Sequence, residues 1–148
     1  MAEKKYDETE LLEKGWIKAW LVFEVQASTK EIAEQSLKKH INSITTDEKR
    51  VYVTEENFTA TEKIDAPERI KKQGVEVLFS QVAEIIIFVR EFEGIVNIVI
   101  NYAPSVVEII APEKITLSMR DAQGALASVA DMMHKYAQAG IGGMLLKS

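Results

Sequence analysis

The chain has 148 residues and a formal net charge of −5, with 47% hydrophobic and 28% charged residues. This composition is typical of one globular domain, and the acidic balance argues against a protein that holds nucleic-acid phosphates on a basic face. The absence of cysteine excludes disulfides, thiolate nucleophiles and thiolate zinc sites. No apolar run reaches the roughly 18–20 residues of a membrane helix, and no signal peptide is visible. We therefore expect a cytoplasmic protein without a cofactor.

The first half of the chain begins with a charged arm, residues 1–15, which ends at Gly15. Residues 16–27, WIKAWLVFEVQA, are predicted to form a central strand. Ser28 and Glu31 form a capping box, which begins a helix. That helix turns the following apolar residues inward: Ile32, Ala33, Leu37, Ile41 and Ile44. His40 lies beside this stripe, where packing at the helix edge is favoured over a role as base or ligand.

Residues 50–64 alternate twice between apolar and polar, which predicts strand structure with an interruption at residues 55–57. Residues 65–74, DAPERIKKQG, form a polar connection. Residues 75–89 alternate with a period of two, although a helix also fits part of the spacing. The β-branched run from Ile85 to Ile87 favours a strand, whose length predicts a bulge or a bend near residues 80–81.

The second half continues with helical spacing over residues 92–102, which Pro104 ends, and with a short strand, SVVEIIA, at residues 105–111. Ser118 is an N-cap candidate for a last helix that Gly140 closes, before a glycine-rich tail at residues 140–148. The inner stripe predicted for this helix consists of Ala122, Leu126, Val129, Ala130, Met133 and Ala137. Met132, His134 and Tyr136 flank that stripe.

This order predicts an α+β fold, a ferredoxin-like βαββαβ sandwich over residues 16–139 with an additional C-terminal helix. Both internal helices would then cover one face of the sheet. The other face would carry apolar side chains of the central strand, namely Leu78, Val82, Ile86 and Phe88. Either the C-terminal helix or a second copy of the protein must cover them, so we expect a homo-oligomer, with a homodimer as the simplest case.

A resemblance to known proteins lies in EFEGIVNIVINYAPSVVEIIAPEKI and the following helix, which ends in MMHKYA. This run resembles the closing half of ferredoxin-like regulatory modules. Over residues 91–137 it is similar to the C-terminal extension of WYL-domain transcription regulators, with Ala103-Pro104 in place of a Gly-Pro turn. The whole chain also resembles small uncharacterised archaeal proteins. These resemblances imply a fold, and no functional residue maps across.

Three functions are open at this point. The favoured one is a non-catalytic oligomerising module that binds a small ligand or a protein partner. Its ligand or interface candidates are Leu78, Val82, Ile86, Phe88, His134 and Tyr136. The second is a small enzyme that pairs His40 or His134 with Glu84 or Asp131 as acid and base. The third is an RNA-binding module that uses strand aromatics, Trp16, Tyr52 or Phe58, although the net charge opposes nucleic-acid binding. Two histidines without a spacing relation predict no metal site.

Overall fold

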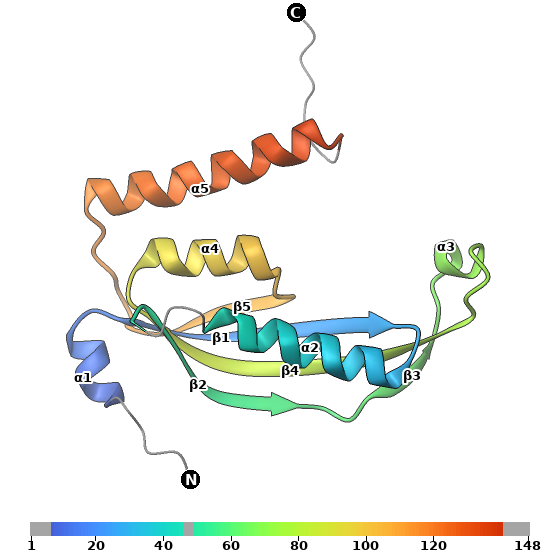
Figure 1. The fold of residues 1–148 in the computed structure, drawn as a ribbon. Helices are drawn as coiled ribbons and strands as arrows, with labels where there is room; N and C mark the ends of the chain where they lie inside the picture. The colour runs from blue at the N-terminus through green and yellow to red at the C-terminus, as the bar shows by residue number, and fades with distance from the viewer. Residues whose placement is uncertain (1–6, 46–48, 141–148) are drawn as a thin grey trace, which may run out of the picture.

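The computed structural model describes residues 7–45 and 49–140 (Figure 1). The predicted charged arm contains a short helix, and all of the predicted tail after Gly140 lies outside the described residues. The elements follow one another in this order: α1 (Glu8–Glu13), β1 (Ile17–Ala27), α2 (Lys30–Ile44), β2 (Val51–Phe58), β3 (Glu62–Asp65), α3 (Glu68–Lys71), β4 (Val77–Val89), α4 (Phe92–Tyr102), β5 (Val106–Ala111) and α5 (Met119–Gln138).

One five-stranded antiparallel sheet organises the chain, and the α+β prediction is confirmed. The strands lie in the order β2-β4-β1-β5, and β3 pairs with β4. The prediction of a strand for the central apolar stretch is also confirmed, because β4 pairs with β1 along an unbroken register from Phe79 to Val89. The bulge predicted near residues 80–81 of β4 is wrong. The irregularity lies instead in β2, between Val53 and Glu55.

The main core lies between the sheet and the helices α2 and α4, which cover the same face (Figure 1). Alternate residues of β1 and β4 point into it, including Leu21, Ile85 and Ile87. Of the stripe predicted for α2, four residues are buried: Ala33, Leu37, Ile41 and Ile44. Ile32 is exposed, because Ala33 takes the inward position in the first turn.

Local signals set the helix ends. The N-cap of α2 is Thr29 rather than Ser28, and its hydroxyl accepts a hydrogen bond from the backbone N–H of Ile32 at 3.1 Å. The predicted cap of α5 is confirmed, since the Ser118 hydroxyl accepts from the N–H of Asp121 at 3.1 Å. At the C-terminal end of α4, Ala103 adopts a left-handed conformation with φ of 48°, directly before Pro104.

Helix α1 covers one end of the sheet face that α2 and α4 leave open. Leu11 of α1 and Trp16, just before β1, form a second buried cluster with Phe88. On the outer side of this helix, Lys14 Nζ lies 2.8 Å from Glu10 Oε1, and this hydrogen bond raises the pKa of the exposed Lys14 ammonium. The arm therefore supplies a small core of its own.

Helix α5 forms a third layer above α4, on the far side from the sheet (Figure 1). The idea that the C-terminal helix covers the open sheet face is therefore wrong. Periodicity identifies the apolar side of a helix but does not tell which layer the helix joins. Within the described residues, no helix is both long and apolar enough to span a bilayer.

Candidate functional site

The four predicted interface residues of β4 lie on one face of the sheet, the face opposite α2 and α4. Leu78, Val82 and Ile86 are half-buried there. Phe88 is fully buried, because Leu11 and Trp16 pack over it and the Lys18 ammonium lies 5.7 Å from its ring centroid. Phe88 is thus part of a core and not an accessible interface residue.

Cross-strand neighbours make this open face less apolar than β4 alone predicts. Glu24 of β1 stands opposite Val82, and Glu55 of β2 stands opposite Ile86. A charged neighbour interrupts the apolar side chains at both points. The pattern of one strand cannot reveal these pairs, because they depend on the register of its partners.

The other two predicted residues, His134 and Tyr136, lie on α5 and are exposed. Helix α5 belongs to the third layer, on the opposite side of the sheet from the open face (Figure 1). The six predicted residues therefore form two separate groups. Of these, only Tyr136 belongs to a second group of accessible apolar side chains, which forms a surface of its own.

That surface is formed by residues 106–136, in the last third of the chain. Among the described residues, all exposed large hydrophobic side chains except that of Ile32 lie between residues 106 and 136. We call these eleven residues the β5–α5 surface: Val106, Val107, Ile109, Ile110, Ile115, Leu117, Met119, Leu126, Val129, Met133 and Tyr136. Exposed apolar side chains gathered in one segment of the chain are a feature typical of interaction sites.

Strand β5 contributes the edge of this surface. It pairs with β1, and along its other edge no strand pairs with it in the described part of the chain. Val107 and Ile109 stand opposite Leu21 and Ala19, on the face that the helices cover elsewhere. Both nevertheless stay exposed, Ile109 to 43%. An apolar edge strand with both faces accessible is a template for pairing with another strand.

Helix α5 contributes the rest, and its orientation differs from the prediction. It faces α4 through small residues: Ala125 is its buried residue, and a Cβ on Gly124 would lie 2.6 Å from Glu93 Oε2. The predicted inner stripe instead points away from α4, with Leu126 at 66% exposure. The outer side of α4 is partly polar, with Glu93 and Asn97, so the polar and small side of α5 packs there.

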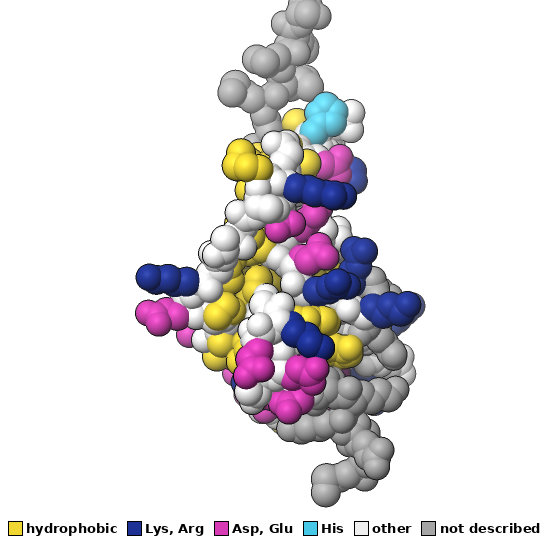
Figure 2. All heavy atoms as spheres, turned by 90° about the vertical axis from the view of Figure 1, so that its left-hand side faces the viewer, with side chains coloured by type: hydrophobic (Ala, Val, Ile, Leu, Met, Phe, Trp, Pro, Cys, Tyr) yellow, Lys and Arg dark blue, Asp and Glu magenta, His cyan; other side chains and the backbone are white. Residues whose placement is uncertain are grey.

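Figure 2 shows where these side chains reach the surface. Hydrophobic side chains lie on the left-hand side of α5, at the top of the view, and again in the narrow region beneath it. Basic and acidic side chains line the right-hand side of α5. The helix thus presents one apolar and one charged flank, and the apolar flank lies on the same side as the hydrophobic region below.

Neither histidine forms the acid–base pair of the enzyme hypothesis. His40 Nε2 lies 2.7 Å from the carbonyl oxygen of Tyr102, which can only accept, so this nitrogen carries the proton. The ring packs edge-on against Phe23 and Tyr102, as the packing interpretation expects. Glu84 points to the other sheet face. Asp131 pairs with Lys135 at 2.9 Å rather than with His134. Within residues 7–45 and 49–140, no cluster of side chains could hold a metal ion.

The comparison with protein families gives one result. A family model described as the MJ0538 family matches residues 18–144. The chain belongs to the MJ0538 family. No curated protein matches it. The resemblance to WYL-domain regulators over residues 91–137 receives no support from this match. The matched region of the MJ0538 family runs from β1 through α5, so it includes the whole β5–α5 surface and leaves out α1.

The aromatic residues named for RNA binding do not form an exposed platform in this MJ0538-family chain. Trp16 is buried and stacks on Tyr52, with ring centroids 5.2 Å apart. Phe58 packs against the main core. Base stacking needs accessible aromatic faces. The hydrophobic core uses these rings instead.

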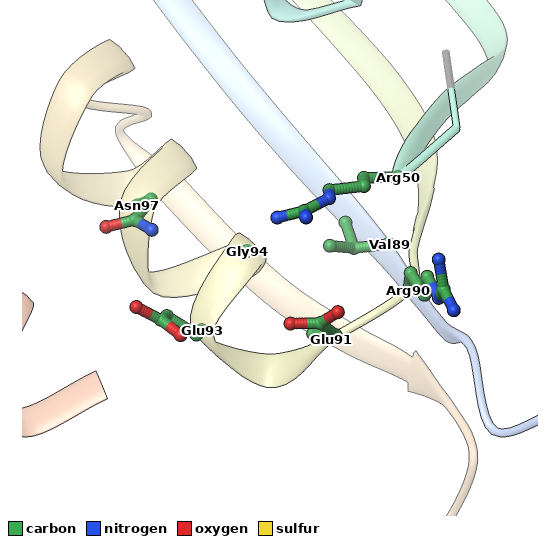
Figure 3. Close-up of a pocket in the computed structure, with 7 residues that line it drawn as sticks. All are labelled: Arg50, Val89, Arg90, Glu91, Glu93, Gly94 and Asn97. Carbon is green, nitrogen blue, oxygen red and sulfur yellow. The ribbon is translucent and has the colours of Figure 1, made fainter. Parts of the chain in front are cut away.

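Two hollows lie away from the β5–α5 surface. One, of about 210 Å³, is lined by Phe23, Leu37, His40 and Tyr102 among others. A smaller one, of about 120 Å³, lies at the start of α4, where Arg50 extends toward the helix and Arg90 points away from it (Figure 3). Glu91 and Glu93 line the same hollow, so the two signs of charge offset each other.

Proposed function

We propose that this chain is a non-catalytic module that acts as a homodimer, with the β5–α5 surface as its interface. The observation that carries the proposal is that, among the residues the structure describes, eleven of the twelve exposed large hydrophobic ones lie in one segment, residues 106–136. A surface of this kind is unfavourable in water and becomes favourable when a partner covers it. The absence of a histidine–carboxylate pair among the described residues is consistent with a binding role.

A second copy is the partner that β5 fits best. An unpaired antiparallel edge is complementary to itself, and a two-fold axis perpendicular to the sheet would join two β5 strands into one continuous sheet. Such an axis places one residue of β5 opposite its own copy. At Glu108 it would bring two carboxylates together, which disfavours that register. We therefore place the axis at Val107 or Ile109, where apolar side chains meet.

The proposal extends to the fold type. The strand order β2-β4-β1-β5, with α2 after β1 and α4 after β4, supports a ferredoxin-like arrangement. In this interpretation β3 and α3 are insertions between the second and third strands of the basic pattern. Helix α5 is an addition, and it supplies apolar surface that the basic pattern lacks.

Two substitutions of the same chemistry test the role of β5. Ile109→Lys places a charge on the edge strand, whereas Ile32→Lys places one at a similarly exposed isoleucine of α2, outside the surface (43% and 48% exposure). We expect Ile109→Lys to sediment as a monomer at micromolar concentrations where the wild type and Ile32→Lys sediment as dimers. A dimeric Ile109→Lys variant, or a wild type that is monomeric throughout this range, would refute the proposal.

A further inference from the structure

The exposed stripe of α5 has a regular spacing. Its members are Met119, Ala122, Leu126, Val129, Met133 and Tyr136, at alternating intervals of three and four residues. This is the a and d pattern of a coiled coil. In the structure five of its six members are exposed, and most of the stripe turns away from α4, whereas Tyr136 borders a hollow that Asn97 and Ile100 of α4 also line. The pattern thus predicts a helical partner that the single chain does not provide.

The residues beside the stripe limit what this partner can be. The flanking positions carry no charge: they are Gln123, Ala125, Ala130, Met132 and Ala137. In coiled coils, charges at these positions select or reject partners. Here two identical helices can approach without like-charge repulsion. The charged residues, such as Asp131 and Lys135, lie elsewhere on the helix and pair with each other at 2.9 Å.

We propose that α5 pairs in antiparallel orientation with α5 of a second copy. This inference rests on the proposed homodimer and adds the helix contact to it. Helix α5 lies in a layer roughly parallel to the sheet (Figure 1). The two-fold axis that joins two β5 strands would therefore also relate two α5 helices in antiparallel orientation. Both contacts can then belong to one symmetric interface.

Antiparallel pairing also matches side-chain sizes across the seam. Leu126 faces Val129 of the second copy, and Ala122 faces Met133 of the second copy, so a small residue meets a long one. Parallel pairing would place Ala122 opposite its own copy and leave a void in the seam. The antiparallel arrangement fills each layer of the seam. It also orients the two helix dipoles in opposite directions, which places ends of opposite sign side by side.

The size of the interface favours the combination of strand and helix. A stable interface usually takes roughly 20–30 residues from each side. Strand β5 has six residues, too few by itself. Helix α5 adds 20 residues, a length of about 30 Å. Only the stripe and its flanking positions would face the second copy, so the helix adds eleven residues to the six of β5, close to the lower end of that range.

Disulfide trapping tests the orientation, because the natural chain has no cysteine to compete. The Ala122→Cys and Met133→Cys variants are mixed and oxidised. Antiparallel pairing predicts a mixed disulfide between the two variants. A control mixture of Arg120→Cys and Lys135→Cys lies in the same antiparallel register but off the stripe, and should stay uncoupled. A predominant link between two copies of the Ala122→Cys variant, or no excess over the control mixture, would overturn the proposal.

Charge substitution separates this inference from the dimer itself. Leu126→Lys should raise the dimer dissociation constant by roughly tenfold or more, whereas Ala127→Lys, next to it but off the stripe, should leave that constant within about twofold. If Ile109→Lys dissociates the dimer and Leu126→Lys does not, the β5 interface stands and the helix seam is wrong. If the wild type is monomeric, both proposals fail.

Discussion

At the residue scale, two glycines show how the neighbouring atom decides whether a position tolerates a side chain. A Cβ on Gly94 would lie 2.6 Å from Cγ1 of Val89, and one on Gly124 would lie 2.6 Å from Oε2 of Glu93. Val89 is buried and β-branched, so it cannot move aside. The Glu93 carboxylate ends a flexible side chain that can rotate away. Equal distances therefore have different consequences.

The matched pair Gly94→Ala and Gly124→Ala tests this difference. Alanine favours a helix over glycine by about 1 kcal/mol, whereas overpacking a core costs about 1–3 kcal/mol. We expect Gly94→Ala to lower the free energy of unfolding by about 1–2 kcal/mol. Gly124→Ala should leave it unchanged or slightly higher. Urea unfolding at one protein concentration measures both, and equal losses in the two variants would contradict this explanation.

At the scale of elements, the sequence predicts most of the helices and strands, though not the short α3, better than it predicts what they pack against. The alternation over residues 75–89 correctly predicts β4, because a strand with one buried face must alternate. The accessible face of the sheet is less apolar than β4 alone predicts, because Glu24 of β1 and Glu55 of β2 stand beside the apolar side chains of β4. The apolar stripe of α5 is likewise correct as a pattern and wrong as a core, because the period of a helix face does not identify its partner.

The helices α2 and α5 should therefore differ in what they contribute to stability. Leu37 of α2 is buried under the sheet, whereas Leu126 of α5 is exposed. Leu37→Ala should cost about 2–5 kcal/mol of unfolding free energy. Leu126→Ala should cost less than about 0.5 kcal/mol when both proteins are diluted to monomers. Chemical unfolding monitored by circular dichroism measures both values. A large cost for Leu126→Ala in the monomer would place its stripe in the core of a single chain.

At the scale of the whole molecule, the sequence predicts accessible apolar side chains on one side of the sheet, and the structure exposes its large apolar side chains mainly elsewhere. The prediction places the accessible side chains on β4, at Leu78, Val82, Ile86 and Phe88. The structure covers Phe88 with Leu11 and Trp16, and exposes β5 and α5 instead. The pattern of a strand does not tell whether it lies at the edge or in the centre of the sheet. The pattern of a helix likewise does not tell whether it lies in an inner or an outer layer. Composition and period indicate that apolar side chains will be left exposed, whereas their location depends on topology.

The most direct test is the mass of the wild-type protein in solution as a function of concentration. Sedimentation equilibrium should give twice the chain mass of 16.6 kDa at micromolar concentrations, falling toward the chain mass on dilution. A mass of 16.6 kDa at every concentration would contradict the proposed dimer and leave the β5–α5 surface without its second copy.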